Sequence, residues 1–430
     1  MKHIYRLILI VELLFLSVAA MGQTGGTMPQ PAFHWRCTSG DTVLNFHPAT
    51  TTPLLFDSIP FSKDYTMIVV YKPVADTEAA VWNLFFSDSI IRGLTTQRII
   101  LDDTRIQYSE GGDGSPAIHT LRQSSPNIAD PHVVLSVGDS HIMVAEILYF
   151  DRRLDNAALR YVQSVLAIRY GVTLGPIDYL GGDGTHIWDH QRDSALFHHR
   201  ITGLGCDTIC GLSQLRSRSE MEGGMVTVAT DSLPQGAYLL FGDDDAPLSF
   251  FQEESGIEVL SRRWKVQSVR LEDDAFSFIF DTRELPGPTD SLVLMVDGNI
   301  VMPSAVSPGE VRFDDVWMPS DSSIFTLARG PEFWQRAQNT FKNARHDVGN
   351  VGRTHFRLYP NPTTGKFNIE VSGAHQAEVS IYDLQGKLVA TYSGNGRDRY
   401  CFQGTLPSGN VYYATITTEN GSQTMKLIVK

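Results

Sequence analysis

The chain has 430 residues, of which 42% are hydrophobic and 10% aromatic, so it can fill several hydrophobic cores. At roughly 150 residues per domain we expect about three domains. The formal net charge of −13, with no stripe of Lys and Arg among aromatic residues, excludes a nucleic-acid-binding protein. Short apolar runs separated by Gly and Pro predict an all-β, multidomain fold made of consecutive β-sandwiches.

The first 22 residues have the pattern of a signal peptide. Lys2 and Arg6 precede an apolar run from Leu7 to Ala20, which Glu12 interrupts. This run is shorter than the ~20 residues of a membrane span. Small residues follow at Ala20 to Gly22, so we expect cleavage before Gln23 and export.

Residues 33–173 predict one β-sandwich that closes with a helix. Asp155 is placed to cap this helix, Leu154 can pack on Leu159, and Gly171 is a plausible stop. The strings Glu146–Leu154 and Val165–Leu174 resemble the end of concanavalin A-like, laminin G-like jelly rolls in surface proteins of Bacteroidota. That resemblance implies a jelly roll.

Catalytic patterns are hard to find in this unit. Jelly-roll glycosidases carry Glu-x-Asp-x-x-Glu on one strand, because a retaining pair of carboxyl groups must stand ~5–5.5 Å apart. Glu146 has Leu148 at the second position and is predicted to be a salt-bridged or edge residue of its strand. The signatures of serine hydrolases, dinucleotide-binding proteins, P-loop proteins and zinc proteases are missing from the sequence. Trp82 and Tyr108 could stack on sugars, although core positions are commoner for such residues.

Residues 174–330 predict a second β-rich unit. Ile187-Trp188-Asp189, Ile201–Gly205, Leu212–Ser219 and Arg263–Gln267 resemble, in their order, a domain of unknown function that accompanies such jelly rolls in adhesin-like proteins. The family brings no activity with it.

Metal binding and a disulfide are alternatives within this unit. His186, Asp189 and His190 could be read as a zinc shell, but solvated loop histidines fit a strand or loop better. A calcium ion is one possible cofactor, bound by Asp243–Asp245 or by Asp102-Asp103, because Ca²⁺ prefers oxygen ligands such as carboxylates. Cys206 and Cys210 are close enough for a disulfide around a tight loop, whereas Cys37 and Cys401 are expected not to pair with each other.

Residues 331–355 are poor in apolar side chains and predict a linker. Residues 356–430 then predict a small β-domain, because Phe367, Ile369 and Val371 alternate with polar residues and Asn420-Gly421 is a hairpin signal. Asn410 stands as an extra residue between Gly409 and Val411, where we expect a β-bulge.

This last segment resembles the type A C-terminal sorting domain of type IX secretion substrates, an Ig-like β-sandwich. The matching positions are Tyr359, Pro360, Asn361, Pro362, Gly365, Asp383, Gly386, Gly409, Tyr412, Lys426 and Lys430. The resemblance implies an outer-membrane type IX translocon and a sorting peptidase as partners. It also implies either attachment to an anionic lipopolysaccharide or release, and therefore a secreted or outer-membrane surface location reached through the periplasm.

Two functions remain for the rest of the chain. The first is a non-catalytic adhesion protein that binds a glycan or a surface protein, and the missing carboxylate pairs and triads favour it. The second is a secreted hydrolase, a glycosidase or peptidase, with an unfamiliar site. A pair of carboxylates converging in a groove would favour the second function.

Overall fold

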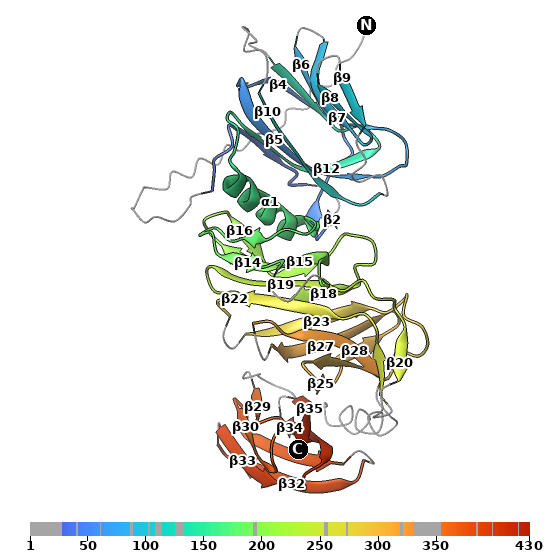
Figure 1. Cartoon of the computed structure of the whole chain (residues 1–430), viewed down its shortest axis with the longest axis vertical. Coiled ribbons are helices and arrows are strands. Elements are labelled where there is room, and N and C mark those ends of the chain that lie inside the picture. Colours follow the sequence, from blue (N-terminus) through green and yellow to red (C-terminus); the bar gives the residue numbers. More distant parts are fainter. Residues whose placement is uncertain are drawn as a thin grey trace.

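The computed structural model describes residues 28–39, 42–60, 62–86, 89–101, 104–107, 114–124, 133–191, 196–252, 257–271, 274–318, 321–329, 354–383, 386–397, 399–419 and 421–430. Its β units follow one another along the long axis, with the C-terminal unit at one end (Figure 1). The fold is all-β and multidomain, as the sequence predicted. The predicted signal peptide and nearly all of the predicted linker lie outside the described residues.

The N-terminal unit is a sandwich of two antiparallel sheets, with strand orders β1-β12-β5-β10 and β4-β11-β6-β7-β8-β9. Alternate residues of β5, among them Met67 and Val69, point into a core that also contains Trp82 and Tyr149. Trp82 is fully buried, so it is a core residue and not an exposed sugar platform. The strands are β1 (Phe33–Arg36), β2 (Thr42–Leu44), β3 (His47–Pro48), β4 (Leu54–Ile59), β5 (Asp64–Pro73), β6 (Ala80–Phe86), β7 (Ser89–Thr95), β8 (Arg98–Leu101), β9 (Thr104–Gln107), β10 (Ala117–Ser124), β11 (Val133–Val137) and β12 (Ile142–Phe150).

The helix α1 (Asn156–Tyr170) confirms the predicted capping. Asp155 accepts a hydrogen bond from Ala158 N at 2.8 Å, and Gly171 ends the helix in the left-handed region. One face of α1 packs on the outer face of the first sheet, and the other packs on the next unit. The helix is therefore shared between two cores and not only the end of the first sandwich.

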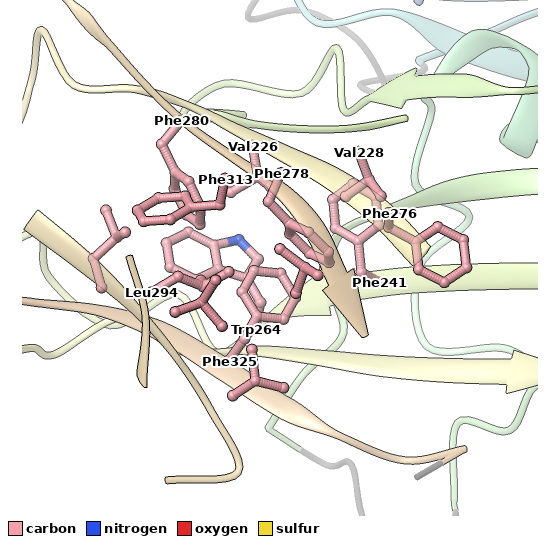
Figure 2. Close-up of a cluster of buried hydrophobic side chains, with 14 of the residues drawn as sticks. Val226, Val228, Phe241, Trp264, Phe276, Phe278, Phe280, Leu294, Phe313 and Phe325 are labelled. Carbon is pink, nitrogen blue, oxygen red and sulfur yellow. The ribbon is translucent and has the colours of Figure 1, made fainter. Parts of the chain in front are cut away.

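The middle unit is a second sandwich. One sheet contains β16-β15-β19-β22-β28-β24-β25, and the other has the order β17-β18-β23-β27-β26. Figure 2 shows its aromatic core, in which Trp264 stacks on Phe325 at 5.6 Å between ring centroids. The strands are β13 (Tyr179–Leu180), β14 (His186–Trp188), β15 (His199–Asp207), β16 (Leu212–Gln214), β17 (Arg216–Arg218), β18 (Val226–Ala229), β19 (Ala237–Asp243), β20 (Phe250–Gln252), β21 (Glu258–Leu260), β22 (Trp264–Val269), β23 (Ala275–Asp281), β24 (Leu292–Val296), β25 (Asn299–Val301), β26 (Ala305–Ser307), β27 (Glu310–Trp317) and β28 (Ile324–Arg329).

The C-terminal unit has its own core between the sheets β29-β30-β33 and β35-β34-β31-β32. Strand β35 also pairs with β25 of the middle unit through Ile300 and Thr424, which makes the two sheets continuous at their edges. The strands are β29 (His355–Tyr359), β30 (Lys366–Ser372), β31 (Gln376–Tyr382), β32 (Leu388–Asn395), β33 (Arg399–Thr405), β34 (Asn410–Thr418) and β35 (Gly421–Val429).

One expectation for this unit is wrong. The bulge expected at Asn410 is not formed, because Asn410 opens β34 and pairs directly with Val429 in an unbroken register. Gly409 provides the preceding turn with φ of 79°, so Asn410 needs no irregular backbone.

Candidate functional site

The Tyr359–Pro362 segment of the C-terminal unit closes its last strand. Asn361 Nδ2 donates to Lys426 O at 2.5 Å, and Asn361 Oδ1 accepts from Ile428 N at 2.9 Å. Lys430 N donates to Thr363 O at 2.8 Å. The structure therefore brings together the two ends of the predicted sorting signal: Asn361 bonds to Lys426, and Lys430 bonds to Thr363.

The two proline peptides beside Asn361 share one configuration. Both Tyr359–Pro360 and Asn361–Pro362 are cis. The Tyr359 hydroxyl donates to Glu370 Oε1 at 2.6 Å, and this hydrogen bond raises the pKa of Tyr359 to about 12. Tyr359 and the three residues after it are all exposed, so another protein can contact the whole segment directly.

The other residues of the predicted signal lie in turns or form hydrogen bonds to the backbone near them. Gly365, Gly386 and Gly409 all have positive φ, between 76° and 130°, where a side chain would be strained. Asp383 Oδ1 accepts from Lys387 N at 2.9 Å. Tyr412 is buried, and its hydroxyl reaches Pro407 O at 3.4 Å. These residues build the module's fold and do not gather into one pocket.

The disulfide that the sequence permitted between Cys206 and Cys210 is not formed. All four cysteines, Cys37 and Cys401 included, are free thiols. Cys210 is buried with its Sγ 3.5 Å from Asp207 O, and burial raises the pKa of its thiol. A protonated, buried thiol is a poor nucleophile, so Cys210 is a packing residue.

The acidic run Asp243–Asp245 is neutralised by arginines. Arg200 binds Asp243 Oδ1 at 2.6 Å and also contacts Asp245, and Arg263 lies 3.1 Å from Asp244. These guanidinium groups supply the positive charge that a calcium ion would bring. Asp102 and Asp103 lie outside the described residues.

The histidine rings of the middle unit have different neighbours. His186 is exposed and lies 3.4 Å from Asp178, while the His190 ring faces that of His198 at 6.1 Å. In the part of the chain that the structure describes, no group of three or more His, Cys, Asp or Glu residues is arranged to hold a metal ion.

Glu146 is a buried salt-bridge residue, the first of the two roles that its sequence context predicted, and its strand β12 is not an edge strand. Its carboxylate accepts from Arg169 Nη1 at 2.8 Å, from the Tyr170 hydroxyl at 2.7 Å and from His34 Nε2 at 2.7 Å. Burial alone would raise the pKa of Glu146, but the charge of Arg169 and the bond from His34 hold it well below its ordinary range. These contacts join the first sheet to α1.

A hollow that the sequence analysis missed lies where the hairpin β2–β3 meets β17. The tip residues Asn45 and Phe46 have φ of 45° and 67°, a conformation costing a residue such as Phe of order 1 kcal/mol. Asn45 holds this tip, because its Nδ2 donates to Ile168 O at 2.9 Å and its Oδ1 accepts from Arg218 N at 2.7 Å. The strained tip presents the Phe46 ring to two arginines.

The hollow has a volume of about 320 Å³ and is lined mainly by polar residues. The guanidinium carbon of Arg216 lies 4.3 Å from the Phe46 ring centre, and that of Arg218 lies 5.7 Å from it. Arg283 completes a set of three arginines against two acids, Asp281 and Glu310. The walls therefore carry one net positive charge in an acidic protein.

Only one of these arginines has no carboxylate partner among the described residues. Arg218 lies 3.4 Å from Glu220, and Arg283 is paired with Asp281, but Arg216 has only the Phe46 ring. The alternation Arg216-Ser217-Arg218 in β17 was the available sequence signal, since alternate residues of a strand share a face. It was insufficient because Phe46 comes from a distant hairpin.

Comparison with known families first defines the class of protein. Residues 357–430 match the secretion system C-terminal sorting domain. The chain is therefore a secreted or cell-surface protein exported by the type IX secretion system. The described part of the chain contains no helix long and apolar enough to cross a membrane.

The central part of the chain matches a second family. Residues 158–308 match the domain of unknown function DUF8202. This match starts inside α1, whereas the sequence prediction placed the start of a domain of unknown function at residue 174. No curated protein matches the chain.

Solved structures give only distant likenesses. A Faecalibacterium prausnitzii beta-glucuronidase is 10% identical over 44% of this chain and 37% of its own length, with a TM-score of 0.16. The BSP domain of a biofilm associated protein is 8% identical over 95% of this chain and 84% of its own, with a TM-score of 0.15. This chain thus spans little more than a third of the glucuronidase, and such TM-scores carry no argument about its function.

Proposed function

We propose that this exported protein is a non-catalytic binding protein of the cell surface or the medium, and that its arginine-lined hollow binds an acidic glycan. The observation that carries the proposal is Arg216, held over Phe46 at 4.3 Å and without a carboxylate partner among the described residues. A guanidinium group binds a carboxylate or sulfate through two parallel hydrogen bonds. The ring beneath it fixes the plane of the guanidinium group and leaves its edge for the ligand.

The neighbouring arginines support the same ligand. Arg283 is exposed and paired with Asp281, and this exposed pair contributes little to stability, so an anionic ligand can compete for the guanidinium group. The chain's net charge of −13 repels polyanions elsewhere on its surface. Binding is therefore expected to concentrate at this hollow and to weaken as salt rises.

A glycan array probed with the purified full-length protein tests this proposal. We expect uronic-acid-bearing and sulfated glycans to be retained and neutral glycans not to be. Arg216→Ala should weaken retention about tenfold or more, as expected for a lost charged contact of ~1.5–3 kcal/mol. Arg312→Ala is the matched control, because Arg312 lies on β27 outside the hollow and pairs with Asp314 at 2.7 Å.

Three outcomes would contradict the proposal. Retention that is unchanged in Arg216→Ala would place the ligand elsewhere on the protein. An array on which no acidic glycan is retained would exclude the proposed class of ligand. Turnover of a retained glycan, lost on replacing a pair of acids, would make the protein a hydrolase.

We further propose that a sorting peptidase cuts the chain within residues 331–355 after it crosses the outer membrane. The separate core of the C-terminal unit supports this, because the two products can each keep a folded core. Attachment to an anionic lipopolysaccharide, or release, would then follow. Mass spectrometry of the protein recovered from the host's surface and medium tests the position of the cut, and intact chains in both places would contradict it.

A further inference from the structure

The sorting domain covers an apolar face of the middle unit. The strands of that unit's larger sheet carry apolar residues on both faces: Leu294 and Val301 point into its core, whereas Val293, Ile300 and Met302 belong to a second cluster. Tyr413 of β34 is a member of this second cluster, so the C-terminal unit takes part in burying it.

Burial within the sorting domain shows the same contact from the other side. Tyr412 and Ala414 of β34 point into the domain's own core. Tyr413, Thr415 and Thr424 lie on the opposite face of the sheet, and yet they are only 2%, 7% and 1% exposed. A small module standing alone would leave that face to water.

At the edge of this contact, one strand of the middle unit pairs with one strand of the sorting domain. Ile300 of β25 and Thr424 of β35 are antiparallel partners, and Figure 1 shows both strands at the junction of the two units. Removal of β35 opens the edge of β25, whose backbone groups then need a new strand, and it exposes Ile300. An open edge beside apolar side chains is a site for pairing with another strand.

We propose that this face of the middle unit becomes the interface of a symmetric dimer once the sorting domain has been removed. A second copy fits because β25 of one protomer can run antiparallel to β25 of its partner about Ile300. The backbone groups of β25 then pair with the same groups of the partner's β25 across a two-fold axis. The inference rests on the cut proposed above, but it is independent of the glycan proposal.

The test uses the full chain with a recognition site for a specific protease placed within residues 331–353. Light scattering after gel filtration should give the mass of one chain before the cut. We call the segment before the cut the passenger and the segment after it the tail. After the cut and separation from the tail, light scattering should give the mass of two passenger segments. Ile300→Asp should keep the cut passenger monomeric, whereas Val306→Asp, on the exposed edge strand β26, should leave the dimer intact.

A second variant leaves the passenger unchanged. Thr424→Arg puts a long charged side chain into the covered face, opposite to the tail's own core, and should undock the tail so that the uncut chain dimerises. Val389→Arg is its control, because Val389 is 40% exposed on β32 at the far edge of the same sheet.

Several results would overturn the proposal. They are a cut passenger that stays monomeric, a dimer that survives Ile300→Asp, a tail that remains bound through gel filtration, or an undocked Thr424→Arg chain that stays monomeric. Cutting in vitro separates this failure from a failure of the proposed cleavage in the host.

Discussion

The ion pair between Glu146 and Arg169 is predicted to be the most sensitive charged contact of the N-terminal unit. The side chains are 1% and 5% exposed, and Arg169 Nη1 contacts both carboxylate oxygens, at 3.1 and 2.8 Å. Arg169→Met removes the guanidinium group and leaves a buried carboxylate with its bonds from Tyr170 and His34. Losing one partner of a buried pair costs about 3–5 kcal/mol, so we expect a loss of that size in the free energy of unfolding.

Urea unfolding at pH 7, followed by circular dichroism and fluorescence, measures this loss. Arg152→Met is the control, because Arg152 is 52% exposed, lies 3.6 Å from Asp151 and should cost at most about 1 kcal/mol. The double variant Glu146→Leu with Arg169→Met should recover most of the loss, since no charge then stays buried. A loss below about 1 kcal/mol for Arg169→Met, or none recovered in the double variant, would refute the reasoning.

The same carboxylate predicts a direction for the pH dependence of stability. Because folding lowers the pKa of Glu146, its contribution is fully present above the unfolded pKa of about 4.3. The contribution is lost as the pH falls below that value toward the folded pKa. Unfolding titrations of wild type and Glu146→Gln should therefore converge as the pH falls below about 4; a constant gap down to pH 2 would contradict this assignment.

Three further substitutions test other parts of the fold. Gly203→Ala should cost about 1–3 kcal/mol by thermal unfolding, because its Cβ would lie 2.6 Å from Leu240 Cα on the neighbouring strand; an unchanged melting temperature would show that the strands can separate. Asp155→Ala should cost about 1 kcal/mol through loss of the helix cap, and Asp155→Asn should restore most of it. Asn361→Ala removes two hydrogen bonds to β35 and should reduce the protein exported by a type IX host, whereas the exposed Asn395→Ala should export normally.

Local signals in the sequence predicted the helix and the sorting module well. Asp155 and Gly171 act within one turn of α1, so their roles depend only on neighbouring residues. The alternation of Phe367, Ile369 and Val371 likewise describes one strand by itself, and these three residues lie in the core. Each of these features needs no knowledge of what lies beyond its own element.

Features that join distant segments could not be predicted in the same way. The hollow needs Phe46 beside Arg216, 170 positions further along the chain, and the junction needs Ile300 beside Thr424. The spacing of Cys206 and Cys210 permitted a bridge, but the strand β15 that contains Cys206 and the turn that contains Cys210 leave both thiols free. Pairing between segments is fixed by the whole fold, which short-range patterns do not encode.

A signal for the unit boundaries is nevertheless present in strands that are apolar on both faces. In β5 the side chains alternate between two cores, with Met67 in the sandwich and Ile68 against α1. The same alternation occurs in β24 and in β34, where Tyr412 faces the module and Tyr413 the neighbouring unit. A sandwich strand with one wet face should alternate with polar residues. Uninterrupted apolar runs in a chain of small sandwiches therefore mark the faces where one unit covers the next. Here they indicate the face of the N-terminal unit that α1 covers and the face of the C-terminal unit that packs on the middle unit.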